Sequence, residues 1–278
     1  MKANNLSISI PYAVCGKDCP YCISKMTGYM HTIDNSENNL FIKNLQKARR
    51  LADSLGIASI MITSKGEPLN NMKIVKLINN YFSDYPIEIQ TNGLPLLVEE
   101  NHDQLKGLAN IFCVSADMPD YFQSISQLSQ VWNKIRSFDA ISRATVIVSN
   151  RFKGWKLSNF IVACQHMGIR QLTFRRTTIP DNCVKTKQSK DAQKWIKDHY
   201  ADAHYKLIVD EIKERVTLKD LIMTLPFGPS VYDIEGISVT FMDYCFQEFS
   251  DGENIRSLIY QEDGHMYLTW DKQGSIIW

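Results

Sequence analysis

The sequence lacks any run of about eighteen apolar residues, so we expect no transmembrane helix. Its first residues, MKANNLSISIPYAV, are too polar, and their apolar part is too short, for a signal peptide. An excess of one charge is also missing, because the net charge is only +1. Bulk electrostatics therefore does not favour a nucleic acid as a partner. These absences predict a cytoplasmic protein with no membrane partner.

An even set of cysteines at paired spacings is missing as well. The chain has seven cysteines, an odd number, whereas a secreted disulfide framework favours an even number at paired spacings. Three of them, Cys15, Cys19 and Cys22, lie within eight positions and indicate metal or redox chemistry in a reducing compartment. The other four have no neighbouring cysteine: Cys113, Cys164, Cys183 and Cys245.

Short β-type runs alternate with helical patterns over the first two-thirds of the chain. The patterns predict strands at 6–14, 57–63, 87–91, 110–116, 143–149 and 171–176, and helices at 39–56, 71–84, 123–138 and 157–168. Near-continuously apolar strands are typical of a parallel sheet with helices outside it. The sequence therefore predicts an α/β protein whose sheet is either open or curled into a partial barrel, and we expect the partial (β/α)6 TIM-like barrel. In both cases the functional loops follow the carboxyl ends of the strands.

The pattern changes after about residue 180. Residues 186–206 predict helix or loop, and 232–242 predict one strand. Residues 256–278 predict antiparallel strands with turns at Asp263-Gly264 and near Gly274. We therefore predict two domains, a barrel core over 1–180 and a C-terminal α+β extension over 181–278 that lids or caps the barrel.

The three clustered cysteines lie in the segment CGKDCPYC, directly after the first predicted strand. Thiolates this close can surround one iron–sulfur cluster or one zinc ion. Structural zinc prefers four protein ligands, and His31 would be the fourth ligand in that alternative. A non-catalytic zinc-binding interaction module is therefore one of the open alternatives.

The spacing Cys-x3-Cys-x2-Cys, with Tyr21 just before the last cysteine, resembles that of the radical S-adenosylmethionine (SAM) enzymes. The resemblance implies that Cys15, Cys19 and Cys22 hold three irons of a [4Fe–4S] cluster and that SAM binds the fourth. It implies reductive cleavage of SAM to methionine and a 5′-deoxyadenosyl radical, which abstracts hydrogen from a substrate. An external one-electron reductant of the flavodoxin or ferredoxin type is then needed.

Later segments, up to roughly residue 180, extend this resemblance. SKGEP resembles the family's Gly-Gly-Glu-Pro turn, so Gly66 and Glu67 would bind the SAM ammonium. Lys65 replaces the first glycine, and its side chain would crowd the methionine if that position required a positive φ. The segment QTNG, which contains Asn92, is a second family-like motif. The resemblance implies these further SAM contacts: Tyr21 to adenine, Ser115 or Asp117 to ribose, Arg143 to the carboxylate and Asn150 to adenosine.

Some of these residues also fit ordinary structural roles. Ser115 and Asp117 equally suit a helix cap, and Arg143 suits an exposed strand start. Arg175 and Arg176 end the sixth predicted strand, and alternation predicts that only one faces the cavity, where it could bind an anionic substrate group.

Cys245, in the extension, is a candidate hydrogen-atom donor, and the alternative is a small buried side chain. The substrate stays open among a small molecule, a nucleotide and a peptide. A glycyl-radical-enzyme activase is the alternative enzyme. It ranks second because such activases resemble the core but usually lack an extension of this length.

Overall fold

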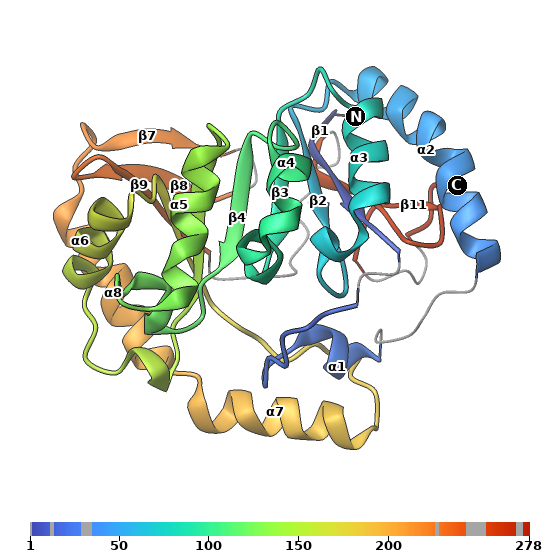
Figure 1. The fold of residues 1–278 in the computed structure, drawn as a ribbon. Helices are drawn as coiled ribbons and strands as arrows, with labels where there is room; N and C mark the ends of the chain where they lie inside the picture. Colours follow the sequence, from blue (N-terminus) through green and yellow to red (C-terminus); the bar gives the residue numbers. More distant parts are fainter. Residues whose placement is uncertain (1, 12–13, 29–34, 226–227, 243–253, 271–274) are drawn as a thin grey trace.

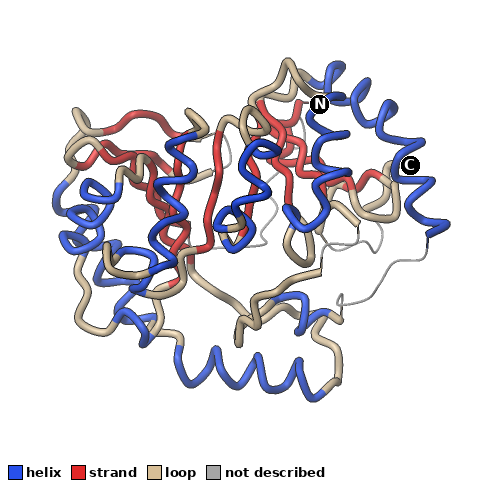
Figure 2. Tube along the Cα trace, in the orientation of Figure 1, coloured by secondary structure: helices blue, strands red, loops and turns tan. Residues whose placement is uncertain are grey.

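The structure is a computed structural model that describes residues 2–11, 14–28, 35–225, 228–242, 254–270 and 275–278. These residues form a mixed sheet with helices packed on it (Figures 1 and 2). The strands are β1 (Lys2–Ser9), β2 (Ser59–Thr63), β3 (Ile87–Thr91), β4 (Ile111–Ser115), β5 (Ile141–Ile147), β6 (Gln171–Arg175), β7 (Leu221–Thr224), β8 (Ser230–Ile234), β9 (Ile237–Met242), β10 (Asn254–Tyr260) and β11 (Met266–Tyr267). The α-helices are α1 (Ile23–Thr27), α2 (Asn35–Leu55), α3 (Met72–Tyr81), α4 (His102–Leu105), α5 (Gln130–Ser137), α6 (Leu157–Met167), α7 (Lys187–His199) and α8 (Asp202–Arg215). Short 3₁₀ helices are η1 (Pro68–Asn71), η2 (Leu94–Leu97), η3 (Glu99–Asn101), η4 (Pro119–Phe122), η5 (Gln127–Ser129) and η6 (Asn150–Phe152).

The sheet of the described residues has eleven strands in the order β11-β10-β1-β2-β3-β4-β5-β6-β9-β8-β7. From β10 to β9 all neighbouring strands are parallel, whereas β11 at one end and β8 and β7 at the other pair antiparallel. Since β11 and β7 end the order, the sheet is open. This confirms the predicted α/β fold with a partial TIM-like barrel.

The C-terminal extension adds strands to both ends of the core sheet. On one side β10 pairs with β1, with Ile259 beside Ser7. On the other side β9 pairs with β6, with Thr240 beside Thr173. The parallel part of the sheet therefore continues into residues beyond 180, and the predicted domain boundary near residue 180 stays a prediction.

The prediction of one strand over 232–242 was wrong. The segment belongs to a hairpin, β8 and β9, that turns at Glu235 and Gly236 with φ of 54° and 82°. Positive φ at both central residues gives a turn whose twist matches the paired strands. A glutamate rarely adopts positive φ, so its side chain gave no sign of the turn.

Two further predicted boundaries differ from the structure by about five residues or more. β1 ends at Ser9, shortly before Pro11, which has no N–H for a strand ladder. The helix predicted over 123–138 begins only at Gln130, because the 3₁₀ helix η5 precedes it. The predicted turn at Asp263-Gly264 is confirmed, since the Gly264 N–H donates to the Gln261 carbonyl at 2.9 Å, whereas Gly274 lies outside the described residues.

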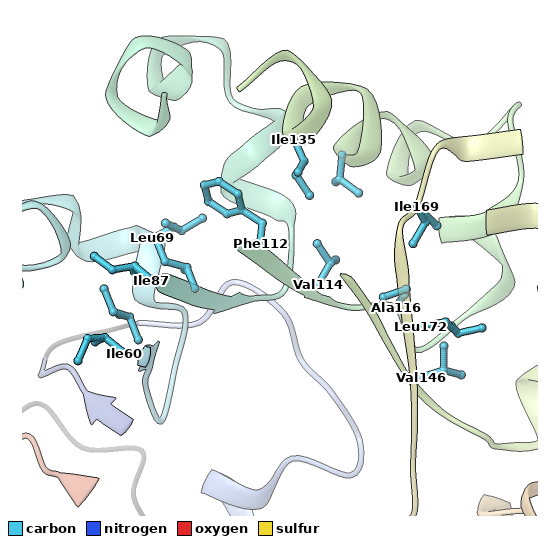
Figure 3. Packing of buried hydrophobic residues seen from close by; sticks show 14 of the residues in the cluster. Ile60, Leu69, Ile87, Phe112, Val114, Ala116, Ile135, Val146, Ile169 and Leu172 are labelled. Atoms are coloured by element: carbon cyan, nitrogen blue, oxygen red, sulfur yellow. The ribbon is translucent and has the colours of Figure 1, made fainter. Parts of the chain in front are cut away.

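One face of the sheet packs against helices and is apolar. Figure 3 shows Ile60, Phe112, Val114 and Val146 on this outer face, with Ile135 of α5 above them. All five side chains are fully buried. Burial of such side chains removes apolar surface from water and holds the helices on the sheet.

The opposite, inner face is largely polar. Alternate residues of a strand point to opposite sides of the sheet, so the residues between the apolar outer positions lie on this face. From β1 to β6 and on β9, the residues that alternate with the outer positions include Ser7, Ser9, Met61, Thr63, Glu88, Gln90, Cys113, Ser115, Arg143, Thr145, Ile147, Gln171, Thr173, Arg175, Ser238, Thr240 and Met242. The strand register sets neighbouring members level, as in the row Gln90, Cys113, Arg143, Gln171 and Ser238. The inner face therefore offers hydrogen-bonding groups up to the carboxyl edge of the sheet.

Helices α1 and α7 lie together, apart from the helices that cover the outer face (Figure 1). Before α7, the Val184 N–H donates to the Met26 carbonyl of α1 at 2.8 Å. After α7, Tyr200 forms a bridge with Ser149, which follows β5. Helix α7 therefore runs along the carboxyl edge from the side of the first strand to that of the fifth. No helix in the described ranges has the length and apolar character to cross a membrane.

Candidate cofactor-binding site

Cys15, Cys19 and Cys22 lie in the loop between β1 and α1, at the carboxyl edge of the sheet. All three are free thiols; Cys15 is exposed, and the other two are half-buried. The Cys22 N–H donates to the Cys19 carbonyl at 3.3 Å, and Cys22 is also the N-cap residue of α1. This turn brings the last two cysteines close together just before the helix begins.

The chemistry of these donors fits a soft metal centre. Deprotonated, these cysteines become thiolates, which are ligands that iron–sulfur clusters and zinc prefer. Among the described residues, however, no three His, Cys, Asp or Glu side chains converge closely enough to hold an ion. His31, the fourth ligand of the zinc alternative, lies outside the described residues, as does Cys245.

Burial controls the protonation of the middle cysteine. It raises the pKa of Cys19 to about 11, although the positive charge of Lys17 opposes this effect. The metal-free thiol is therefore protonated at neutral pH. Since the thiolate is the metal ligand, binding at Cys19 would release this proton.

Asp117, which follows β4, joins the cysteine loop to the rest of the sheet edge. Its side chain is only 3% exposed, and it forms ion pairs with Lys17 and with Arg151. The Arg151 contact joins Nη1 to Oδ2 at 3.1 Å. Lys17 comes from between the first two cysteines, whereas Arg151 follows β5, so one carboxylate connects three loops. Sequence reasoning missed both cations, whose only signal was their position beside predicted site residues.

Asn92, which follows β3, reaches the same loop. Its side-chain N–H₂ lies 3.5 Å from the Cys15 sulfur and donates to it. The backbone carbonyl of Asn92 accepts a hydrogen bond from the Tyr121 hydroxyl at 2.8 Å, and the Lys17 ammonium donates to the same hydroxyl at 3.3 Å. The first cysteine and the loop lysine are thereby linked to the end of the third strand.

Tyr21, beside the last cysteine, packs on the extension. Its ring centroid lies 5.2 Å from that of Trp195 in α7. Burial raises the pKa of Tyr21 well above its usual value, and a hydrogen bond to Asp117 adds to this effect. The Arg151 guanidinium lies over the Trp195 ring, 5.6 Å from its centroid. Trp195 was not predicted as part of the site, because its helical segment carries no motif.

Glu67 links the two family-like turns. Its side chain is almost fully buried and accepts hydrogen bonds from the Thr91 hydroxyl (2.8 Å), the Asn92 N–H (2.6 Å) and the Leu69 N–H (3.1 Å). Burial raises the pKa of Glu67, and these three hydrogen bonds oppose the shift. The carboxylate therefore holds the turn after β2 against the end of β3. Its contact with a SAM ammonium stays a prediction.

Lys65 does not meet the condition under which it would crowd a ligand. Within the described ranges, the only non-glycine residues with positive φ are Asp139 and Glu235. The Lys65 ammonium pairs with Glu262, which follows β10, so the side chain reaches towards the extension. The next residue, Gly66, donates its N–H to the Ser64 hydroxyl at 3.1 Å.

The other predicted SAM contacts lie at different levels of the sheet. Ser115, at the end of β4, is exposed, and its carbonyl accepts a hydrogen bond from Lys17 at 3.4 Å. Asn150 is exposed after β5. Arg143 lies deeper, near the start of β5, where it pairs with Glu88 and donates to Gln171 at 2.7 Å. The structure therefore gathers Asp117, Tyr21 and Asn92 around the cysteines but leaves Arg143 on a lower level.

Alternation along β6 sets Arg175 and Arg176 on opposite sides of the sheet. The outward Arg176 pairs with Asp202 of α8, with Nη2 to Oδ1 at 2.9 Å. Arg175 belongs to the inner face, and its Nε is buried with no hydrogen-bond partner in the described part of the chain.

A pocket of about 170 Å³ opens beside the cysteine loop, and its lining includes Gly16, Glu67 and Asn92. This volume is below the roughly 300–1,000 Å³ of most ligand sites, so the pocket would accommodate only part of a cofactor such as SAM. A pocket of about 350 Å³ near the end of α8, lined by Arg215 and Asp233, contains none of the predicted site residues.

The fold is similar to that of SuiB from Streptococcus suis. The crystal structure of SuiB bound to S-adenosylmethionine superposes with a TM-score of 0.61 at 12% identity, over 99% of this chain and 63% of that one. SuiB bound to the precursor peptide SuiA gives 0.61 at 12% identity, over 95% and 59% of the two chains. This likeness shows a shared fold, and the chain spans about 63% of the length of SuiB. No protein-family model and no curated protein matches the sequence.

Proposed function

We propose that this chain is a radical SAM enzyme. Cys15, Cys19 and Cys22 would bind a [4Fe–4S] cluster, and SAM would bind beside it. The observation that carries the proposal is the position of these three free thiols. They share one loop at the carboxyl edge of a sheet whose fold is also that of a SAM-bound protein. The Cys-x3-Cys-x2-Cys spacing supports the same assignment.

The residues around the loop would position the reactants. When bound, the cluster would supply the electron that splits SAM into methionine and a 5′-deoxyadenosyl radical. The Lys17–Asp117 ion pair would fix the cysteine loop, and Glu67 would keep the two neighbouring turns together. Helix α7, whose Trp195 packs on Tyr21 of the cysteine loop, would shield this edge from water.

We propose a peptide or small-molecule substrate that binds on the polar inner face. The precursor peptide bound to SuiB supports a peptide, and the hydroxyl, amide and charged groups of the inner face suit a polar substrate. The activase alternative is less favoured, because α7 spans the edge that a partner protein's glycine would have to approach.

The test is anaerobic reconstitution with iron and sulfide, followed by reduction in the presence of SAM and measurement of 5′-deoxyadenosine. We expect the wild-type chain to release this product and Cys19→Ala to release none, since two thiolates do not hold the cluster. Cys183→Ala, outside the loop, is the matched control and should behave as wild type. Product release by Cys19→Ala would contradict the proposal, and a colourless wild-type chain with one bound zinc would favour the interaction module.

A further inference from the structure

We infer that Arg175 is the anchor of a carboxylate-binding subsite on the inner face of the sheet. The inference rests on the proposed function, because it names the chemical group that the substrate would present there. It depends on three observations: the position of Arg175, the pairing of the arginines around it and the charge of the inner face.

Arg175 lies on the inner face at the carboxyl edge of the sheet. It is the last residue of β6 and stands level with Ile147 and Met242 on the neighbouring strands. The row below it carries four hydroxyl groups, from Ser115, Thr145, Thr173 and Thr240, set level across four adjacent parallel strands. A group held by the guanidinium would therefore lie over a surface rich in hydrogen-bonding side chains.

The pairing of arginines around the site sets Arg175 apart. Arg143 pairs with Glu88, Arg151 with Asp117 and Arg176 with Asp202. Arg175 has no such carboxylate partner among the described residues, and its Nε is buried without a hydrogen-bond acceptor. A buried donor without an acceptor is unfavourable, so a ligand oxygen that accepts from Nε would remove that penalty.

The charge of Arg175 also acts on Cys113, which lies in the row two levels below it. Burial raises the pKa of the Cys113 thiol, and the positive charges of both Arg143 and Arg175 oppose the shift. Cys113 also lies 3.1 Å from the Thr145 hydroxyl, which belongs to the row between them. The two guanidiniums therefore act on the same part of the inner face.

The charge of this region selects a monoanion. Glu88 neutralises Arg143, so Arg175 leaves one positive charge without a counterion on the described strands. A guanidinium matches the two oxygens of a carboxylate in a planar, bidentate geometry. A phosphate dianion carries two negative charges, so a single guanidinium would leave one of them unpaired, and phosphate is less favoured.

The 278-residue chain without its cluster is sufficient for the test, because the subsite contains no cluster ligand. The probes are N-acetylglutamate α-amide, N-acetylalanine, the neutral N-acetylglutamine α-amide and inorganic phosphate. Binding is followed through the Nε–Hε NMR signals of the arginines, with that of Arg175 identified by its loss in Arg175→Lys. The first probe carries a side-chain carboxylate and the second a terminal carboxylate, so the two arms distinguish the sources.

We expect at least one carboxylate probe to shift the Arg175 signal saturably and the neutral amide to leave it in place. Arg175→Gln should weaken binding of that probe by about tenfold or more, as measured by calorimetry. Arg176→Gln, the outward neighbour, should bind the probe like wild type. An unmoved Arg175 signal, or equal weakening in both variants, would overturn the subsite, and tighter binding of phosphate would overturn the assigned ligand class.

This outcome is separable from the proposed function. A chain that cleaves SAM but leaves the Arg175 signal unmoved by carboxylates overturns the subsite alone. A chain that binds carboxylates through Arg175 but never yields 5′-deoxyadenosine overturns the enzyme class alone.

Discussion

The two faces of the sheet obey different rules, although the same strands build both. On the outer face, Phe112 and Val146 are fully buried beneath helices, and their role is packing. On the inner face, the adjacent Cys113 and Thr145 are polar and hydrogen-bond to each other. The outer face needs only apolar side chains of suitable volume, whereas the inner face needs a partner for each polar group.

This difference indicates which residues are available for function. Inner-face polar groups mostly satisfy one another, as Arg143 does with Glu88 and Gln171. Where they do not, as at Arg175, an external ligand is the physically reasonable partner.

Truncating an outer-face residue should destabilise the fold most. Phe112→Ala would leave a cavity between the sheet and α5, and we expect it to lower the free energy of unfolding by about 3–5 kcal/mol. The matched variant is Cys113→Ala on the inner face of the same strand, which should cost only about 1 kcal/mol. Chemical denaturation measures both values, and equal losses would contradict the distinction between the faces.

Breaking the inner-face ion pair should have an intermediate effect. Glu88→Gln would leave the Arg143 guanidinium without its counterion, and we expect a loss of about 2 kcal/mol, less than for a fully buried pair because Arg143 is 26% exposed. In the double variant Glu88→Gln/Arg143→Met the losses should be clearly less than additive, since neither partner is then left as an unpaired charge. Strict additivity in a double-mutant cycle would show that the two side chains do not interact.

Reactivity of the metal-free cysteine loop should depend on pH. With a pKa of about 11, Cys19 is ionised to about one part in a thousand at pH 8, so its alkylation by iodoacetamide should be slow. The rate should rise about tenfold per pH unit up to that pKa, because only the thiolate reacts. Mass spectrometry of modified peptides measures it, and a rate that levels off below pH 9 would contradict burial of this thiol.

Loosening the loop should give a smaller change in the same assay. Asp117→Asn removes the ion pairs with Lys17 and Arg151, so we expect Cys19 alkylation to speed up several-fold as the loop opens more often. The exposed Asp120→Asn, three residues on, is the control and should leave the rate unchanged. Equal rates in the two variants would mean that Asp117 does not hold the loop.

Local patterns in the sequence predicted much of the parallel core. Strand β3 was predicted with its observed bounds, because apolar residues at 87–91 end in the turn residues Asn92-Gly93. The hairpin at Glu235 was missed, since positive φ at a glutamate leaves no mark in composition. The extension's place at both ends of the sheet depends on pairings between residues far apart in the chain, as for Ser7 and Ile259.

The candidate site was predictable only where a motif marked it. Cys15, Cys19 and Cys22 were predicted as cluster ligands from their spacing alone, and this assignment stays a prediction. The Lys17–Asp117 and Tyr21–Trp195 contacts join segments that are distant in sequence, so only the folded chain shows them. Arg143 and Asp117 were chosen by motif position, and the structure shows both already engaged in ion pairs.

The most direct test of the central claim is the metal content and SAM chemistry of the anaerobically reconstituted chain. We predict about four irons and four sulfides per chain and release of 5′-deoxyadenosine on reduction with SAM. A single tightly bound zinc, with no visible absorption and no nucleoside released, would contradict the proposed enzyme.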